Sequence, residues 1–478
     1  MKKHLLFVFA LFLIAISSCN KADRFASIPE KGNIDDSPSG HYINIEIRNA
    51  PSVLRNSEEA DPMKKIEKLL FVFYADNPEK VVYRYACSAK DLVDSNVTLR
   101  LKPDDYKLLV IANPISSVYS LVQKDAPLQA VETEIKGLTK EFMNKNSENQ
   151  VETITMSNDQ GLLSVSKSNF YKEESEDAVE PVKVVLAPVL ARVLVAGVPT
   201  VQNGKIRGKG HYVINTLSQS IFLMRRMALL KSGKQEVAND GSKTADRYAY
   251  SPGYDKMSSN SDIPISSIEN GAKAPWTDIL PDKQDFIKLY SDHRVYAKET
   301  AVNSDAVFRC VTPNVILKIQ YIPESLDLKE SEGWFKFEGC CYGEEQFKKM
   351  ILEKNFAEKY PSLSKTVDLI KKENGVDFQK LDKGLDLHGL KFYYRSENYY
   401  VIFINHFSYG KPEENKTYGR YGVIRNNQYI LNLKQIQGEG EPVFINLKND
   451  RSSILESMKN KVEITVQDLG SHEQDLFL

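Results

Sequence analysis

The sequence has few of the residue patterns that enzymes use for chemistry. Its 478 residues include five cysteines, two tryptophans and seven histidines, and no CxxC pair with the spacing of a metal site occurs. HExxH, GxSxG, GxxxxGK[ST] and the glycine fingerprint of dinucleotide-binding folds are also absent. The formal net charge of −1, without any basic tract, sets nucleic acid aside as a partner. We therefore expect no enzyme activity, no cofactor and no metal.

A few side chains nevertheless stand where functional residues often stand. His406 lies between Asn405 and Phe407, but no carboxylate or cysteine stands at a useful spacing, so a hydrogen-bonded core or turn histidine is the simpler interpretation. The pairs Asp104-Asp105 and Glu58-Glu59 fit calcium ligands, a glycosidase pair or solvated turn carboxylates. Five aromatic residues fit either a sugar-stacking platform or cross-strand pairs and core: Trp334, Tyr393, Tyr394, Tyr399 and Tyr400.

The first residues have the pattern of an export signal rather than of folded structure. Lys2 and Lys3 form a basic start, Leu5–Ile16 an apolar run that is short for a membrane span, and Ser17–Cys19 a small-residue site ending in cysteine. This leader resembles a bacterial lipoprotein signal, which implies lipidation of Cys19. Residues 20–40, rich in Ser, Asp, Pro and Gly, then form a tether between lipid and fold.

Four cysteines remain once Cys19 is assigned to the lipid. An even number in an exported chain permits disulfides, but a large β-rich core does not need them. We treat the four as buried small hydrophobes: Cys87, Cys310, Cys340 and Cys341.

The segment Tyr42–Arg55 predicts a short strand followed by an accessible loop. Ile43, Ile45 and Ile47 alternate with residues of the opposite face, which is the period of a strand with one buried side. A proline ends the strand, and the polar loop after it carries Arg55, where a protease can reach it. A strand held only by a cleavable loop can be removed. We expect its removal to expose a hydrophobic groove that another copy of the protein fills.

Strand patterns recur through the rest of the chain, whereas helical patterns are sparse. The best helical candidate is Gly343–Lys372, with its length limited by Pro361. The length favours more than one domain. We predict a mainly β fold, with two β-sandwich domains in series and few short helices. The expected ranges are 1–18 for the signal peptide, 19–41 for the tether, 42–55 for the removable strand and cleavage loop, 56–205 for the N-terminal domain and 206–478 for the C-terminal domain.

Four stretches carry a resemblance to a known family. Tyr418–Pro442 (YGRYGVIRNNQYILNLKQIQGEGEP) resembles the C-terminal domain motif of Bacteroidales fimbrillins, the lipoprotein precursors of type V pili, and most of all the short-fimbria major-subunit group. Ile66–Tyr74 with Leu101–Pro114 is similar to the family's N-terminal domain, and Pro188–Val195 to its strand with an Ala-Arg pair. The resemblance implies transthyretin-like sandwiches and a subunit of a surface fibre for adhesion.

The resemblance also implies a route of assembly. The precursor is anchored in the outer membrane through the lipid on Cys19, and an arginine-specific protease then cuts after an arginine beyond the first strand. Arg55 is the first choice and Arg48, at the strand end, the alternative. The mature subunit then joins other copies of itself and other fimbrial subunits in the fimbrium.

The donor strand is expected at 461–478. Val462, Ile464 and Val466 alternate as the three isoleucines near the start do, so the two segments can compete for one groove. Many family members carry a tryptophan after this strand, where Leu469 stands here. The alternatives are a fimbrial anchor or tip subunit, and a glycan-binding surface lipoprotein.

Overall fold

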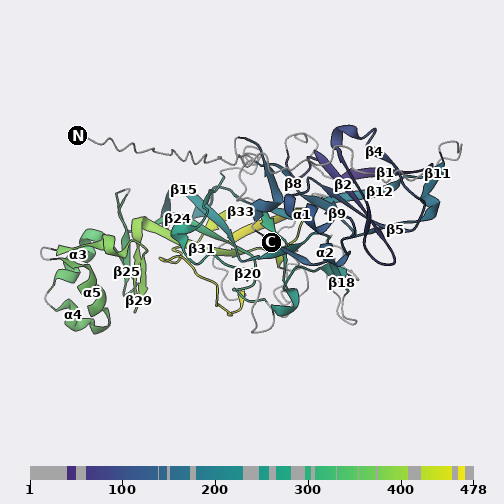
Figure 1. The fold of residues 1–478 in the computed structure, drawn as a ribbon. Helices are drawn as coiled ribbons and strands as arrows, with labels where there is room; N and C mark the ends of the chain where they lie inside the picture. Colours follow the sequence, from purple (N-terminus) through teal and green to yellow (C-terminus); the bar gives the residue numbers. More distant parts are fainter. Residues whose placement is uncertain are drawn as a thin grey trace, which may run out of the picture.

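The structure is a computed structural model of the whole chain. It describes residues 40–49, 61–137, 139–147, 151–172, 179–229, 247–257, 265–280, 296–302, 307–329, 331–353, 355–372, 375–406, 421–454 and 461–468. The described part is elongated, with one large sheet at one end, two smaller sheets in the middle and a group of short helices at the other end (Figure 1). The prediction of a mainly β fold with few short helices is confirmed.

The first sheet folds around a hydrophobic core of its own. Ile43, Ile45 and Ile47 lie in this core with Phe71 and Val110. Along the sheet the order is β11-β1-β12-β9-β5-β2-β3, while β10 pairs with β5 and β4 with β1. The strands are β1 (His41–Asn49), β2 (Lys68–Ala75), β3 (Val81–Ser88), β4 (Asn96–Arg100), β5 (Tyr106–Ala112), β9 (Met156–Asn158), β10 (Leu163–Val165), β11 (Phe170–Lys172) and β12 (Val182–Pro188).

Two strands of this sheet are buried on both faces. Every second residue of β2 and β5 faces the core that holds β1, and the residues between them, such as Val72 and Ile111, face a second core. Short elements cover this second face, with Val118 and Val131 supplied by helices. Burial on both faces explains why β2 and β5 are almost entirely apolar. The covering elements are α1 (Ser116–Leu121), α2 (Gln129–Glu132), β6 (Glu134–Lys136), β7 (Met143–Lys145) and β8 (Val151–Ile154).

Two further sheets enclose the core of the middle part. In one, β33 lies between parallel β13 and antiparallel β34; in the other, β24 lies between β15 and β31. Their apolar faces share one cluster that includes Val193, Leu317 and Tyr429. The first contains β13 (Leu190–Ala196), β14 (Thr200–Val201), β22 (Tyr296–Lys298), β33 (Asn427–Ile436) and β34 (Lys461–Asp468), and the second β15 (Gly204–Asn215), β21 (Thr277–Asp278), β24 (Asn314–Pro323) and β31 (Glu397–Phe403).

The connection between the two halves is shorter than the sequence indicates. Only Val189 separates β12, in the first sheet, from β13, which pairs with strands of the C-terminal half. The expected domain limit at residue 205 therefore differs from the change of sheet at residue 189. Short pairs brace the junction and the loops around it: β6 with β17 (Ser220–Phe222), β16 (Leu217–Ser218) with β20 (Ile265–Ser266), β18 (Met227–Leu229) with β19 (Arg247–Ala249), and β23 (Thr300–Ala301) with β32 (Gly422–Val423).

The helical group is an insertion between β24 and β31. Its small sheet packs on short helices through an aromatic core that includes Phe335, Phe347 and Phe392. The helix expected at 343–372 is divided into three, and a 3-10 turn starting at Pro361 precedes the last of them. The elements are β25 (Trp334–Phe337), β26 (Cys340–Gly343), α3 (Glu344–Leu352), α4 (Phe356–Lys359), α5 (Ser364–Ile370), β27 (Lys371–Lys372), β28 (Gly375–Val376), β29 (Leu385–Leu387) and β30 (Leu390–Tyr393).

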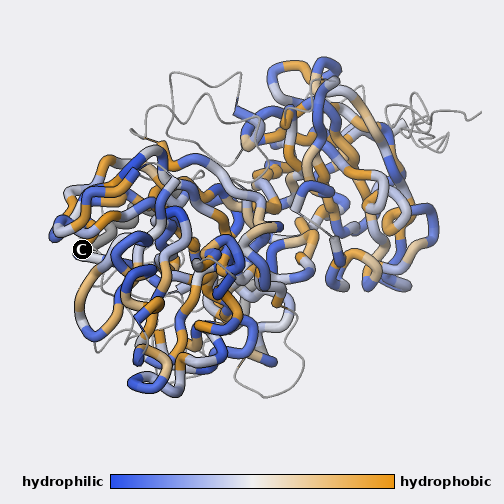
Figure 2. The backbone as a smooth tube through the Cα atoms, turned by 90° about the vertical axis from the view of Figure 1, so that its left-hand side faces the viewer, coloured by the Kyte–Doolittle hydropathy of each residue, from blue (hydrophilic) through white to orange (hydrophobic). Residues whose placement is uncertain are grey.

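Hydropathy follows this architecture. Figure 2 shows many apolar segments in the interior of the described part and many hydrophilic segments at its outer bends. Among the described residues, no helix is both long and apolar enough to cross a membrane.

Candidate functional site

Strand β1 is held in the first sheet from both sides. Its second half pairs in parallel with β12, from Ile45 opposite Val182 to Asn49 opposite Leu186. On the same edge its first residues pair antiparallel with β11, and its other edge pairs antiparallel with β4. The three isoleucine side chains are buried, with at most 6% of any of them exposed. Burial of each such side chain stabilises the fold by about 1.5–3 kcal/mol, so β1 contributes strongly to the first core.

The two candidate cleavage residues lie differently. Arg48 belongs to β1 itself, opposite Val185, and its side chain is 51% exposed and paired with Glu46. Because a protease must draw an extended stretch of backbone into its cleft, pairing of the strand shields the Arg48 peptide bond. Arg55 lies outside the described residues, as do Cys19 and Leu469.

The C-terminal strand occupies an edge of the middle part. Backbone pairing of β34 with β33 places Val462 opposite Leu433, Ile464 opposite Leu431 and Val466 opposite Tyr429. The other edge of β33 is covered by β13 and β14. The described part of the expected donor strand is therefore paired with its own sheet.

A buried polar chain links the start of the first domain to β33. Asp61, the first described residue after β1, accepts a hydrogen bond from Arg192 Nη1 at 2.8 Å, and Arg192 Nε donates to Gln428 Oε1 at 2.7 Å. The Arg192 and Asp61 side chains are 0% and 2% exposed. Gln428 in turn lies opposite Gln467 of β34. This network joins Asp61, in the segment after the expected cut, to β33, the strand with which β34 pairs.

A second buried ion pair joins the loop before β33 to the middle of the chain. Arg425 Nε lies 2.9 Å from Glu299 Oε2, and its two other nitrogens donate to the carbonyl oxygens of Leu223 and Phe222. Sequence analysis missed both buried pairs. The charged residues that pair are 131 and 126 positions apart; Arg192 and Arg425 fall in stretches that carry the family resemblance, but no local pattern marks their acidic partners.

The histidine and the aromatic residues are mostly core. His406 is fully buried, with Nδ1 2.7 Å from the Tyr429 hydroxyl. Trp334 and Tyr393 stack with ring centroids 3.8 Å apart and are both 0% exposed. Because the sandwiched Trp334 ring is inaccessible, it cannot serve as a sugar-stacking surface.

The remaining candidate residues have structural surroundings. Asp104 pairs with Lys167, and the described residues hold no group of His, Cys, Asp and Glu that could bind a metal; Glu58-Glu59 lie outside them. The expectation of four buried cysteines is wrong for Cys340, which is exposed as the first residue of β26, directly after Gly339 at a φ of +78°. Cys310 is buried, and Cys87 and Cys341 are half-buried.

Comparisons with known proteins identify the C-terminal part of the chain. Residues 391–475 match a family model described as the C-terminal domain of fimbrillin, a major fimbrial subunit protein of type IV. The match spans β31, β33 and β34. A search of curated proteins gives no match.

Two of the similar proteins with solved structures come from Porphyromonas gingivalis. A fimbrilin from Porphyromonas gingivalis W83 is 12% identical, with 89% of this chain and 96% of that chain covered and a TM-score of 0.43. The tip fimbrial protein Mfa3 from Porphyromonas gingivalis, with C-terminal truncation, is 11% identical, with 90% and 99% covered and a TM-score of 0.36. Both TM-scores lie below 0.5, so these two likenesses carry no argument here, and the similarity to the fimbrillin family model is confined to residues 391–475.

Proposed function

We infer that this chain, a fimbrillin-family protein by the match of its C-terminal part, is a structural subunit of a pilus that polymerises by exchange of β-strands. In this proposal the precursor is anchored in the outer membrane through a lipid on Cys19. An arginine-specific protease cuts after Arg55, and β1 leaves. The strand 461–468 of a neighbouring copy then takes the vacated place.

The observation that carries the proposal is the position of β1. It lies between partner strands on both edges and buries three isoleucines. Its covalent connection to the rest of its domain nevertheless runs through residues 50–60, which contain Arg55. Its departure would leave an apolar groove with free backbone donors and acceptors. Such a groove binds an added strand through main-chain hydrogen bonds and alternate side chains. The alternating Val462, Ile464 and Val466 match that requirement.

The same arrangement accounts for control of assembly. An open groove would associate at once with other chains, so β1 covers it until proteolysis. Donor and acceptor belong to different surfaces of one subunit, so the contact is heterologous and extends as an open filament. To donate β34, a subunit must first break the pairing of β34 with its own β33. Polymerisation is therefore favourable only if β34 gains more backbone pairing in the neighbouring subunit than it loses in its own. Catalysis plays no part in this function.

Treatment of the full-length precursor with trypsin tests the proposal. We expect loss of the first residues up to Arg55, followed by ladders that resist mild detergent on gels. The Arg55→Ala variant should stay monomeric, whereas Arg48→Ala should polymerise as the wild type does. An N-terminus after Arg48 would move the cut to the alternative site. A cleaved protein that stays monomeric alone but caps ladders of another subunit would instead make this an anchor or tip.

A further inference from the structure

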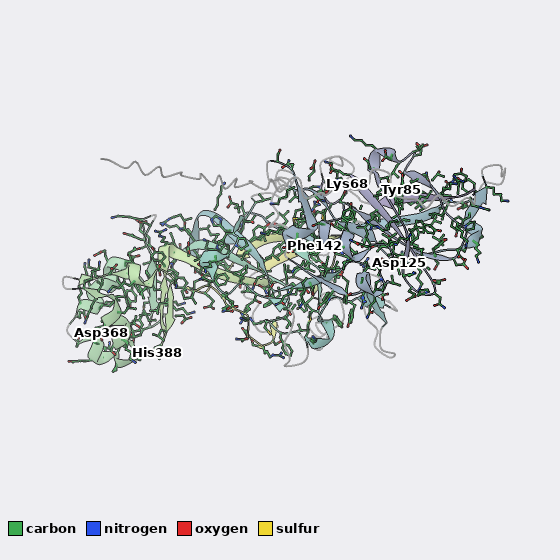
Figure 3. The ribbon with its side chains drawn as sticks, viewed as in Figure 1. Lys68, Tyr85, Asp125, Phe142, Asp368 and His388 are labelled. Carbon is green, nitrogen blue, oxygen red and sulfur yellow. The ribbon has the colours of Figure 1, made fainter. Side chains whose placement is uncertain are left out.

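A surface cavity lies at the end of the first sheet toward which β1 runs. It has a volume of 1310 Å³ and is lined by the start of β2, the end of β3, the turn that follows and Tyr119 of α1. Two of its lining residues, Lys68 of β2 and Tyr85 of the neighbouring β3, are labelled in Figure 3. Its walls combine apolar groups, such as Ile66 and Ala86, with the exposed Lys90. The charged lining residues are three lysines, Lys65, Lys68 and Lys90, and two acids, Glu67 and Asp91, so a segment that is apolar with a small excess of acidic charge would fit these walls.

The cavity is near the C-terminal end of β1. Ile47 N donates to the carbonyl oxygen of Ser95 at 2.8 Å, and four residues back along the chain from Ser95 is Asp91, in the turn that lines the cavity. Four residues span at most about 14 Å. A strand in the place of β1, running in the same direction, would therefore leave the sheet within reach of the cavity.

An exposed apolar side chain lies on this path. Val93 stands between Ser95 and Asp91, and it is 73% exposed. An isolated exposed valine is ordinary, and among the exposed polar residues Asp91, Asp94 and Ser95 it offers one apolar contact between the end of β1 and the cavity. This position suits a chain that crosses from one to the other.

The chain itself supplies a segment of the right length and chemistry. Residues 469–478 follow β34 directly and read LGSHEQDLFL, with Glu473 and Asp475 before an apolar end. Ten residues reach up to about 33 Å, more than the distance to be crossed. We propose that in the fibre residues 469–478 of a second copy pass over Val93 and dock in this cavity. The proposal rests on the strand exchange proposed above, and it assigns a binding place to the part of the expected donor segment 461–478 that follows β34.

Photo-crosslinking tests this contact in the full-length protein. The photoreactive amino acid p-benzoylphenylalanine is placed at Val93, and at the equally exposed Val198 (79% exposed) as a control. An equal mixture of light and heavy-isotope protein is treated with trypsin, irradiated and analysed by mass spectrometry. We expect light–heavy crosslinks between Val93 and residues 469–478, only after trypsin and not from Val198. Ladders with crosslinks to any other segment would overturn the docking proposal alone, whereas absence of ladders from wild-type protein would overturn it together with strand exchange.

Two variants measure how much the docked segment contributes. Ladders of a chain ending at residue 468 should form but dissociate about tenfold faster in warm detergent, a change of about 1.4 kcal/mol. Lys90→Glu should speed dissociation about two- to fivefold, the effect of one exposed charge, and Glu473→Lys in the same chain should restore the wild-type rate. Lys124→Glu, at an exposed lysine outside the cavity, is the matched control. Unchanged dissociation of the shortened chain would contradict the proposal.

Discussion

Arg192 and Asp61 form an ion pair that solvent does not reach. Nη1 lies 2.8 Å from Oδ1, and the two side chains are 0% and 2% exposed. Removing one partner of a buried pair leaves an uncompensated charge, which costs about 3–5 kcal/mol. We expect Asp61→Ala to lower the free energy of unfolding by this amount, measured by urea denaturation of the full-length protein.

An exposed ion pair in the same domain provides the control. Lys80 and Asp125 lie 2.6 Å apart with side chains 40% and 60% exposed. Because water screens such a pair, Asp125→Ala should cost less than about 1 kcal/mol. Equal losses from Asp61→Ala and Asp125→Ala would mean that the buried network does not hold the segment after β1.

Lys298 should make stability depend on pH in the alkaline range. Its ammonium donates to the Gly137 carbonyl oxygen at 2.8 Å, and burial lowers its pKa to about 8, although nearby Glu141 acts in the opposite direction. Between pH 8 and the ordinary lysine pKa of about 10.4, the unfolded chain binds more protons at this group than the folded protein does. The contribution of Lys298 to stability therefore rises with pH through this range.

Comparison with Lys298→Met separates the effect of this group from that of the tyrosines and cysteines that titrate in the same pH range. The free energy of unfolding of the wild type, relative to Lys298→Met, should increase between pH 8 and pH 10 by up to an amount on the order of 3 kcal/mol. Urea denaturation at a series of pH values measures the difference. A difference that stays constant, or falls, with pH would show that the Lys298 ammonium is not disfavoured in the fold.

Trp334 should act in stability rather than in recognition of sugars. Its ring stacks on Tyr393 at an angle of 9°, and its Nε1 donates to the Tyr321 carbonyl oxygen at 3.1 Å. Trp334→Ala removes a buried aromatic side chain and should cost about 3–5 kcal/mol. Thermal unfolding measures the loss, and Trp276→Ala, at a half-buried tryptophan, should cost less. Normal stability of Trp334→Ala with loss of glycan binding would favour the glycan-binding alternative.

The sequence predicts local structure well because local periodicity reflects burial. The alternation of Ile43, Ile45 and Ile47 predicts a strand that the structure places at His41–Asn49. The apolar face of Gly343–Lys372 predicts helix, although the structure breaks it into three parts. In each case the residues that carry the signal are neighbours in the chain.

Partners far apart in the chain could not be predicted in this way. The membership of β13 in the middle part depends on β33, and the contacting residues Arg192 and Gln428 are 236 positions apart. No period in either strand encodes a parallel register with the other. The burial of Asp61 could not be predicted either, because an aspartate after a polar loop has the sequence pattern of an exposed residue. Exposure of Cys340 depends on the turn at Glu338-Gly339, where both residues have positive φ.

The effect of a cavity in the first core should depend on whether the protein has matured. Ile45 and Val110 are both fully buried in that core, but Ile45 belongs to β1 and Val110 to β5. Ile45→Ala should lower the free energy of unfolding of the precursor by about 2–5 kcal/mol, measured by urea denaturation. In the proposed mature fibre β1 is gone, so trypsin-generated ladders of Ile45→Ala should resist heat and detergent as the wild type does.

Val110→Ala is the matched control, because its side chain stays in the groove after cleavage. It should weaken both the precursor and the ladders, whichever strand fills the groove. If Ile45→Ala weakened the ladders as much as Val110→Ala does, β1 would still be in place in the fibre. The groove would then never be vacated, and the subunits would have to be joined elsewhere.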